Sequence, residues 1–424
     1  MLSAMQNRRP HLAIAWTAGA IVMFHAAVAI AAPLTLADVV ERALKFAPSV
    51  SAAEAQSAYG DAREREQFAP LLPAISAGVE YYQAPGYSEV ITNRGQSAAL
   101  LALNYTAWDW GRRSARYHAA RYAAQAATLG IAAARAQIVF DATVGYYELL
   151  RAGAVERELQ SSLVRLDRYV ATIEQLRRSG RAVANDVLKI RSARDAGELG
   201  LASARADRRR ASASLGALIG ESGPSEVEIA DVSGIAEKPT GSLADSPALQ
   251  AARRAVSGAE LQVKAAQAER LPTFQIALSS GFLGIDPPAT VTHNGGASYD
   301  GVISMPVFEG GLIGSHIDQA KAKQRSASAQ LRQTEYLLTR RIADASVRYD
   351  EARDALEILN RAQPTADDAF ALAWTRFLGG GNTTLLEVLD AYQQAEQLKL
   401  NRFDREFAAR EAAAENALLY GRSQ

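Results

Sequence analysis

The stretch that decides the fold is LQSSLVRLDRYVATI, residues 159–173. Its apolar residues step by four, three, four and three positions, which is the heptad spacing of a coiled coil rather than the wider stripe of a globular helix. They are Leu159, Leu163, Leu166, Val170 and Ile173. Because no proline occurs from Arg112 to about Arg178, we predict one continuous helix there, on the order of 100 Å long at about 1.5 Å per residue. A compact globular domain has no use for a helix of that length.

A second heptad stretch lies about 190 residues downstream. It comprises Ile342, Ala345, Tyr349, Ala352, Leu356 and Leu359. We expect Pro364 to kink this helix near its far end, because proline lacks an N–H group and clashes with the preceding turn. Alanine fills much of both stretches, so neighbouring helices can approach closely. The two stretches together predict extended coiled-coil packing.

Four landmarks show that the chain is an internal duplication. Pro48 and Leu72-Pro73 recur 199 residues later as Pro247 and Leu271-Pro272, and Trp108-Asp109-Trp110-Gly111 recurs 200 residues later as Phe308-Glu309-Gly310-Gly311. Gly180 with Asp186-Val187-Leu188 recurs 201 residues later as Gly381 with Glu387-Val388-Leu389, and so does Leu218-Ile219-Gly220 as Leu419-Tyr420-Gly421. We therefore divide the chain into a first repeat (32–220), a linker or equatorial segment (221–244) and a second repeat (245–424).

Each repeat also contains a predicted β-hairpin, at about 74–107 and 273–307. In the first hairpin Ile75, Ala77, Val79 and Tyr81 alternate with small or polar residues, which is the period of a strand with one apolar face. Four such strands leave two open edges, and a membrane would require every edge group to be paired. Single-chain barrels have at least about eight strands, so four can close only by pooling strands between subunits. A small water-soluble sheet in a periplasmic rod is the alternative.

The N-terminus, residues 1–31, has the pattern of an export signal. Arg8 and Arg9 precede a mostly apolar stretch, and Ala29-Ile30-Ala31 is a small-residue cleavage box. Cleavage is expected after Ala31. The alternative is a retained membrane anchor, which the missing basic stop-transfer flank disfavours.

Composition excludes several function classes. Forty-six basic and 46 acidic residues give zero net charge, which offers nothing to attract nucleic acid. The chain has no cysteine, so it has no thiol nucleophile, disulfide or lipid-carrying cysteine. The five histidines lack metal-ligand spacing, and Gly379-Gly380-Gly381 lacks the Lys-Ser/Thr of a phosphate loop. We therefore predict no enzyme activity, no structural metal and no cofactor.

Several motifs resemble the TolC-type outer-membrane efflux proteins. They are the opening Leu34–Leu44, the Leu-Pro pair before each hairpin, the Trp-Asp-x-Gly and Phe-Glu-x-Gly signatures after them, and the stretch Asn382–Ala391. The resemblance implies a mainly α-helical fold with a small membrane β part. In it, three chains would form a coiled-coil α-barrel continuous with a 12-stranded outer-membrane β-barrel, three times the four strands found here. The missing cysteine fits the unlipidated branch of the family.

The resemblance also implies a function: a trimeric exit duct through the outer membrane and periplasm of a Gram-negative bacterium. Such a duct passively conducts substrates delivered by an inner-membrane ABC or proton-driven pump and a periplasmic adaptor, in efflux or type I secretion. The alternative is a periplasmic coiled-coil adaptor or scaffold that spans no membrane. An adaptor would carry one helical hairpin between β-rich domains, whereas this chain has two. The sequence does not reveal the substrate.

We predict two sets of functional residues, both at or just after the turns that end the helix pairs. The turns predict adaptor-docking tips at Gly180, Arg181, Gly381 and Asn382. Glu387 and Asp390 are three residues apart, hence on one helix face. By resemblance to the family's aperture motif, they would point into the tunnel and form an acidic ring. Leu378 and Thr383 replace the Tyr and Arg that the motif can carry. Asp186 is the expected partner from the first repeat, with Arg181 or Arg376 as substitute contacts.

Overall fold

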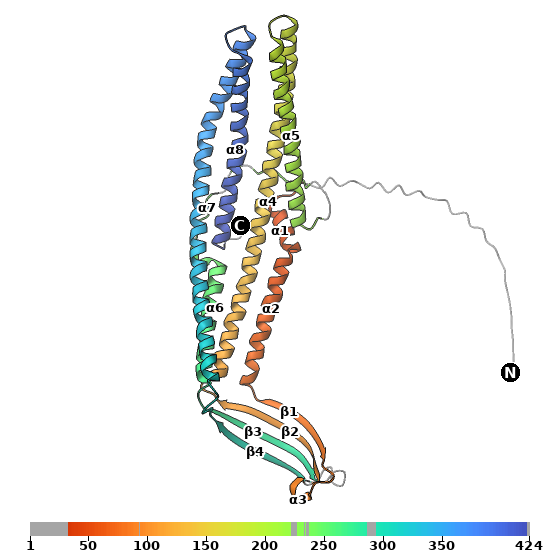
Figure 1. Ribbon diagram of the computed structural model, residues 1–424, viewed down its shortest axis with the longest axis vertical. Helices are drawn as coiled ribbons and strands as arrows, with labels where there is room; N and C mark the ends of the chain where they lie inside the picture. The colour runs from red at the N-terminus through yellow and green to blue at the C-terminus, as the bar shows by residue number, and fades with distance from the viewer. Residues whose placement is uncertain are drawn as a thin grey trace, which may run out of the picture.

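The computed structural model describes residues 33–92, 94–221, 227–232, 234, 237–285 and 294–421. The chain is elongated, with one four-stranded sheet at one end and the tips of two helical hairpins at the other (Figure 1). The predicted export signal and residues 286–293 of the second predicted hairpin lie outside the described residues.

The first repeat begins with helices α1 (Leu36–Phe46) and α2 (Pro48–Phe68), followed by a 3-10 turn at Ala69–Leu71. Strands β1 (Ala74–Gln83) and β2 (Gly95–Trp108) follow, with the short helix α3 (Glu89–Thr92) between them. Helix α4 (Arg112–Arg178) is continuous over 67 residues, as predicted, and α5 (Ala184–Leu218) returns beside it.

The second repeat has the same order of long helices and strands, with a 3-10 turn where the first repeat has α1 and no counterpart of α3 in its described residues. A 3-10 turn at Leu243–Asp245 leads into α6 (Pro247–Ala268), β3 (Thr273–Ile285) and β4 (Asn294–Ser304). Helices α7 (Leu312–Leu378) and α8 (Leu385–Leu419) complete it. Helix α7 runs unbroken through Pro364, and its upper part leans toward α8 (Figure 1). The helix therefore continues past Pro364, and the kink expected there stays a prediction.

The corresponding long helices of the two repeats are equal in length, so a difference in chain length between the repeats must lie in the turns or strands. Helices α4 and α7 each have 67 residues and start 200 positions apart, whereas α5 and α8 each have 35 residues and start 201 positions apart. The turn between α7 and α8 is therefore one residue longer than the turn between α4 and α5. This insertion at one helical tip explains the change of offset from 200 to 201, whereas the change from 199 to 200 arises earlier, between the Leu-Pro pair and Trp108.

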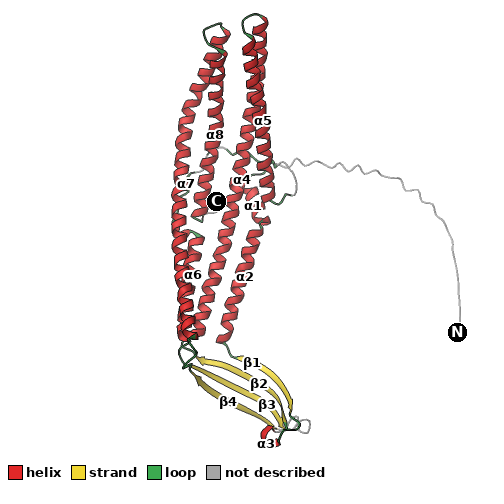
Figure 2. Cartoon of the chain, viewed as in Figure 1, coloured by secondary structure: helices red, strands yellow, loops and turns green. Residues whose placement is uncertain are grey.

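All four strands belong to one antiparallel sheet with the order β1-β2-β3-β4 (Figure 2). The β2–β3 pairing joins the two repeats, with Leu103 opposite Leu278 and a bulge between Thr106 and Trp108. Strands β1 and β4 form the edges, and neither is paired on its outer side within the described residues.

The core is a chain of small clusters along the bundle rather than one central mass. The largest gathers α1, α4, α5 and the start of the linker around Tyr146, whose hydroxyl donates to the carbonyl oxygens of Ala230 and Leu34. Many buried positions are alanines, so the helices pack at close range, as the sequence indicated. The linker also touches the second repeat, because Lys238 forms an ion pair with Asp350 at 2.7 Å.

Candidate channel surface and helical tips

The two faces of the sheet differ in chemistry. Residues opposite one another on paired strands share a face, so the register sorts every strand residue. One face carries Ile75, Val79, Tyr81, Leu101, Leu103, Tyr105, Ile276, Leu278, Phe282, Tyr299 and Ile303. Val79 is 87% exposed and Tyr299 is 86% exposed, so the chain itself leaves much of this face uncovered. This face is suited to contact with lipid.

The opposite face carries both charged side chains of the strands, Glu80 and Asp300, together with most of the amides and hydroxyls. Gln96 donates to the Glu80 carboxylate at 3.3 Å, and the hydroxyl groups of Ser279 and Ser298 are 2.7 Å apart. This face is suited to contact with water. The sheet thus has the apolar-outside, polar-inside alternation of a membrane barrel wall.

A buried ion pair fixes the sheet to the helices in the first repeat. Arg113 donates to the Asp109 carboxylate from its backbone N–H at 2.9 Å and from Nε at 2.8 Å. Its guanidinium also donates to the carbonyl oxygens of Thr106 and Pro70, so it joins β2, α4 and the turn after α2. Burial alone would raise the pKa of the Asp109 carboxyl, but the bonds from Arg113 outweigh it and lower that pKa. The second repeat has Glu309 and Ile313 at the matching positions and cannot form this contact.

Both helical tips are closed by a glycine in the left-handed conformation. Gly180 has φ +76°, and the Arg181 N–H donates to the Leu176 carbonyl at 2.8 Å, which is a Schellman motif. At the second tip Gly380 has φ +75°, and the Gly381 N–H donates to the Arg376 carbonyl at 3.0 Å. The turn glycine that matches Gly180 is therefore Gly380 rather than Gly381, because the extra residue follows it.

The structure connects the two tips through Arg181. Its guanidinium donates to the carbonyl oxygen of Leu378, at the end of α7. Asp186 instead accepts the N–H of Val183 at 3.2 Å and stabilises the start of α5. In the part of the chain that the structure describes, neither Arg181 nor Arg376 forms an ion pair with Asp186. Asn382 is exposed in the longer turn between α7 and α8.

Glu387 and Asp390 both lie exposed in the first turns of α8. The Glu387 carboxylate accepts the N–H of Thr384 at 3.1 Å, and the Thr384 hydroxyl accepts the N–H of Glu387 at 3.3 Å. This reciprocal pair is a capping box, which satisfies two N–H groups at the helix start. Glu387 therefore has a local structural task as well as its predicted place in an aperture.

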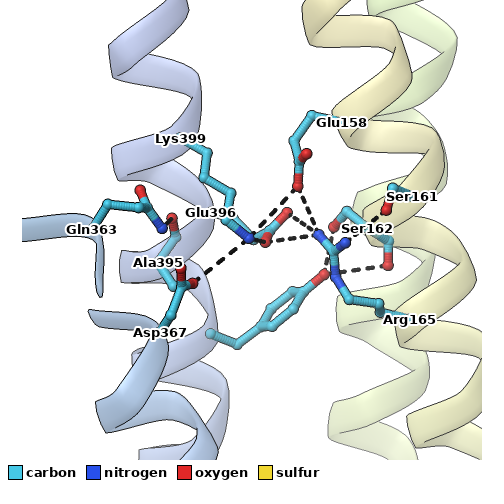
Figure 3. A network of polar contacts seen from close by, with 10 residues as sticks. Glu158, Ser161, Ser162, Arg165, Gln363, Asp367, Ala395, Glu396 and Lys399 are labelled. Carbon is cyan, nitrogen blue, oxygen red and sulfur yellow. Dashed lines mark hydrogen bonds and ion pairs between the residues drawn. The ribbon is translucent and has the colours of Figure 1, made fainter. Parts of the chain in front are cut away.

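A cluster of polar side chains that sequence analysis missed joins α4 to α8 behind the tips (Figure 3). Arg165 of α4 donates to both oxygens of Glu396 at 2.8 and 2.9 Å and to Glu158 at 2.8 Å. Lys399 approaches Glu396 at 3.2 Å and also reaches Asp367 of α7 at 3.6 Å. Glu396 is only 8% exposed, so its charge depends on these cations.

The cluster continues into buried aromatic packing. The Tyr392 hydroxyl donates to the Ser162 carbonyl at 3.2 Å, and burial raises the pKa of that hydroxyl. Tyr169 packs against Trp374 with ring centroids 4.4 Å apart. The available sequence signal was a set of opposite charges, Glu158 with Arg165 and Glu396 with Lys399, flanking the heptad positions. This cluster holds the two helical hairpins together within one chain.

A sheet with one lipid-compatible and one polar face, extended by long helical hairpins, defines a mainly α-helical class of membrane proteins with a small β part. The comparison with solved structures agrees with this class. The fold is similar to CusC (17% identity, 92% of each chain, TM-score 0.83). It is also similar to VceC from Vibrio cholerae (22% identity, 92% of this chain and 97% of that one, TM-score 0.81). A third likeness is to CmeC from Campylobacter jejuni (18% identity, 91% and 85%, TM-score 0.80).

The family itself is shown by sequence. Residues 39–221 and 239–419 match the family described as outer membrane efflux protein, so each matched block spans one repeat. This chain belongs to the outer membrane efflux protein family, and it is an outer-membrane protein with a large periplasmic portion. No curated protein sequence matches it.

Proposed function

We propose that three copies of this chain form a 12-stranded barrel continuous with a helical tunnel. The observation that carries the proposal is the four-stranded sheet with two chemically distinct faces and two open edges. Because its strands alternate in direction, β4 of one copy can pair antiparallel with β1 of the next. Such pairing satisfies the edge groups that a membrane would leave unpaired.

In this assembly the apolar face contacts lipid and the face with Glu80 and Asp300 lines the lumen. The helical hairpins extend the lumen into the periplasm, away from the sheet (Figure 1). The proposed role is passive conduction of substrates that an inner-membrane ABC or proton-driven pump delivers, in efflux or type I secretion. The membership in an efflux family supports this role over the periplasmic scaffold.

The tips are the proposed contact points for a periplasmic adaptor. Gly180, Arg181, Gly381 and Asn382 are exposed at the end of the molecule farthest from the sheet (Figure 1). Exposed polar helix turns offer backbone and side-chain groups to the helical hairpin of an adaptor. The link between Arg181 and Leu378 supports treating both turns as one docking surface.

We also propose that Glu387 and Asp390 form the acidic ring at the periplasmic aperture. Three copies would place two carboxylates each around one opening. Rings of carboxylates in a pore attract cations and repel anions. The exposure of both groups at the start of α8 supports this placement.

The direct test is purification from membranes. We expect the protein in the outer-membrane fraction, soluble only with detergent, as a trimer that opens pores in planar bilayers. A protein that stays soluble as a monomer without detergent and opens no pores would favour the scaffold instead.

A further inference from the structure

The first helical tip carries a positive charge that the second tip lacks. Residues 174–191, which include the turn between α4 and α5, contain five cationic side chains and two carboxylates, so their net charge is +3. The matching residues 374–392 contain one cation, Arg376, and two carboxylates, so their net charge is −1. The whole chain is neutral, with 46 basic and 46 acidic residues. The positive charge is therefore a local feature of one tip.

The carboxylates of the first tip leave most of this charge unbalanced. Glu174 forms an ion pair with Arg191, and the Asp186 carboxylate accepts the N–H of Val183 at the start of α5. The other cations form no ion pair with a carboxylate of the described residues. They are Arg177, Arg178, Arg181 and Lys189. Arg177, Arg178 and Arg181 are exposed, at the end of the molecule farthest from the sheet (Figure 1).

The fold of the tip does not require this excess of cations. Cations in the last turn of a helix are stabilised by the helix dipole, and Arg177 and Arg178 occupy that place in α4. Helix α7, however, has the same length and has only Arg376 in its last turn. Both tips also close with a left-handed glycine, Gly180 or Gly380. The additional charge at the first tip is thus available for contact with another molecule.

An exposed apolar side chain lies within the same turn. Val183 is 63% exposed, whereas the corresponding position at the second tip is the polar Thr384. Burying an apolar side chain against a partner is favourable, and protein surfaces offer apolar contacts that hydrated phosphate groups or sugars do not. Cations around an apolar residue therefore favour a protein partner with acidic side chains over a lipid headgroup layer or a polysaccharide.

We propose that the first tip binds an acidic helical hairpin, so that the periplasmic adaptor carries Asp or Glu side chains where it contacts Arg177, Arg178 and Arg181. This inference rests on the proposed docking at the tips and adds the chemistry of the partner. Complementary charges across an interface fix its register and suppress wrong arrangements. A hairpin in the reverse orientation would bring its carboxylates toward Glu387 and Asp390. The charge difference between the tips thereby sets the orientation of the adaptor.

Binding of two hairpin peptides to the detergent-solubilised protein tests the charge. Both are two-helix coiled-coil hairpins of one sequence, except that the exposed positions around the turn are Glu in one and Lys in the other. We expect the Glu hairpin to bind at least about tenfold more tightly at about 50 mM NaCl. The ratio should fall at about 500 mM NaCl, because salt screens exposed charges.

Charge reversal at the tip should remove this preference. Arg177→Glu with Arg178→Glu changes the net charge of the tip from +3 to −1, which is the net charge of the second tip. Arg177→Lys with Arg178→Lys keeps the charge and should keep the preference. The matched control is Lys321→Glu with Lys323→Glu, which makes the same change in net charge at exposed positions of α7 near the sheet. This control should still prefer the Glu hairpin.

The outcomes separate the acidic partner from the duct itself. If the wild-type protein is a trimer that opens pores but binds both hairpins equally, or binds neither, the acidic partner is wrong and the duct stands. The same holds if the Arg177, Arg178 reversal keeps the preference or the Lys321, Lys323 control loses it. Binding to phosphatidylglycerol vesicles in place of the hairpins, lost in the Arg177, Arg178 reversal, would assign the tip to a membrane instead. If the wild-type protein is a monomer without pores, the proposed function itself fails.

Discussion

The two helical tips occupy equivalent places in the duplicated fold, yet they are built differently. The first turn is short, the N-cap residue of its helix is Val183, whose side chain accepts no hydrogen bond, and the Arg181 guanidinium donates to a carbonyl of the second tip. The second turn is one residue longer, has three successive glycines and starts its helix with the Thr384–Glu387 capping box. The second tip thus contains a complete capping box and the two carboxylates of the proposed aperture, whereas the first tip has only the Asp186 half of a box and donates a hydrogen bond to the second tip.

The largest expected effect concerns docking at the two tips. Arg181→Trp and Asn382→Trp should each abolish the transport phenotype, because a bulky ring at either turn obstructs one continuous surface. Transport is measured as rescue of a deletion strain, and trimer assembly, measured on gels, should remain intact. If only one variant is defective, the tips do not act as one surface; normal transport in both would remove the docking proposal.

The second comparison is at the sheet end, where the first repeat has the buried Asp109–Arg113 ion pair and the second has Glu309 and Ile313 at the matching positions. Asp109→Asn leaves the Arg113 guanidinium without its carboxylate and should lower the free energy of unfolding by about 3–5 kcal/mol. The matched change Glu309→Gln, at an exposed position, should alter it by less than about 0.5 kcal/mol. Urea unfolding of the detergent-solubilised proteins measures both. Equal changes in the free energy of unfolding would show that the Asp109–Arg113 ion pair does not make the first repeat more stable at this end than the second.

The same pair predicts a dependence on pH. Because the pKa of Asp109 is lowered in the folded protein, its contribution is complete above the unfolded pKa of about 3.9 and is lost as pH falls through the folded pKa. The stability difference between wild type and Asp109→Asn should therefore shrink on acidification below about pH 4. A difference that stays constant down to pH 2 would mean that the carboxylate charge is not what matters.

A smaller effect is expected from exchanging the helix caps. Thr384→Val removes the capping hydroxyl and should cost about 1 kcal/mol, whereas Val183→Thr should gain up to about 1 kcal/mol by completing a box with Asp186. Hydrogen exchange of the first-turn amides in each helix would report both changes locally. Opposite signs at the two tips are the expected result; the same sign at both would contradict the difference between them.

Much of the architecture could be predicted from the sequence because it depends on periodicity. The heptads and the missing proline fixed the extent of α4, and alternation within the hairpins fixed which face of each strand is apolar. The recurrence of four motifs in the same order, about 200 residues apart, also predicted the duplication. These are local patterns that tertiary contacts reinforce rather than override.

The contacts at the helical tips were harder to predict from the sequence, because they join residues that are far apart along the chain. Sequence spacing matched Gly180 with Gly381, but the backbone places the left-handed conformation at Gly380, since the inserted residue cannot be located by counting. Within one chain's described residues, Asp186 caps the start of α5 and Arg181 donates to the Leu378 carbonyl, whereas their predicted role at an aperture between copies stays a prediction. The Arg165–Glu396 pair spans 231 positions, which a heptad pattern on either helix does not reveal.

Single-channel recording of wild type against the Glu387→Ala, Asp390→Ala double variant tests the central claim, a trimeric duct with an acidic periplasmic aperture, most directly. The wild-type pore should be cation-selective and blocked by multivalent cations added from the side of the tips. The double variant should show higher resting conductance, weaker selectivity and no block. Wild-type selectivity and block in the double variant would contradict the aperture assignment, and the absence of any wild-type pore would contradict the duct.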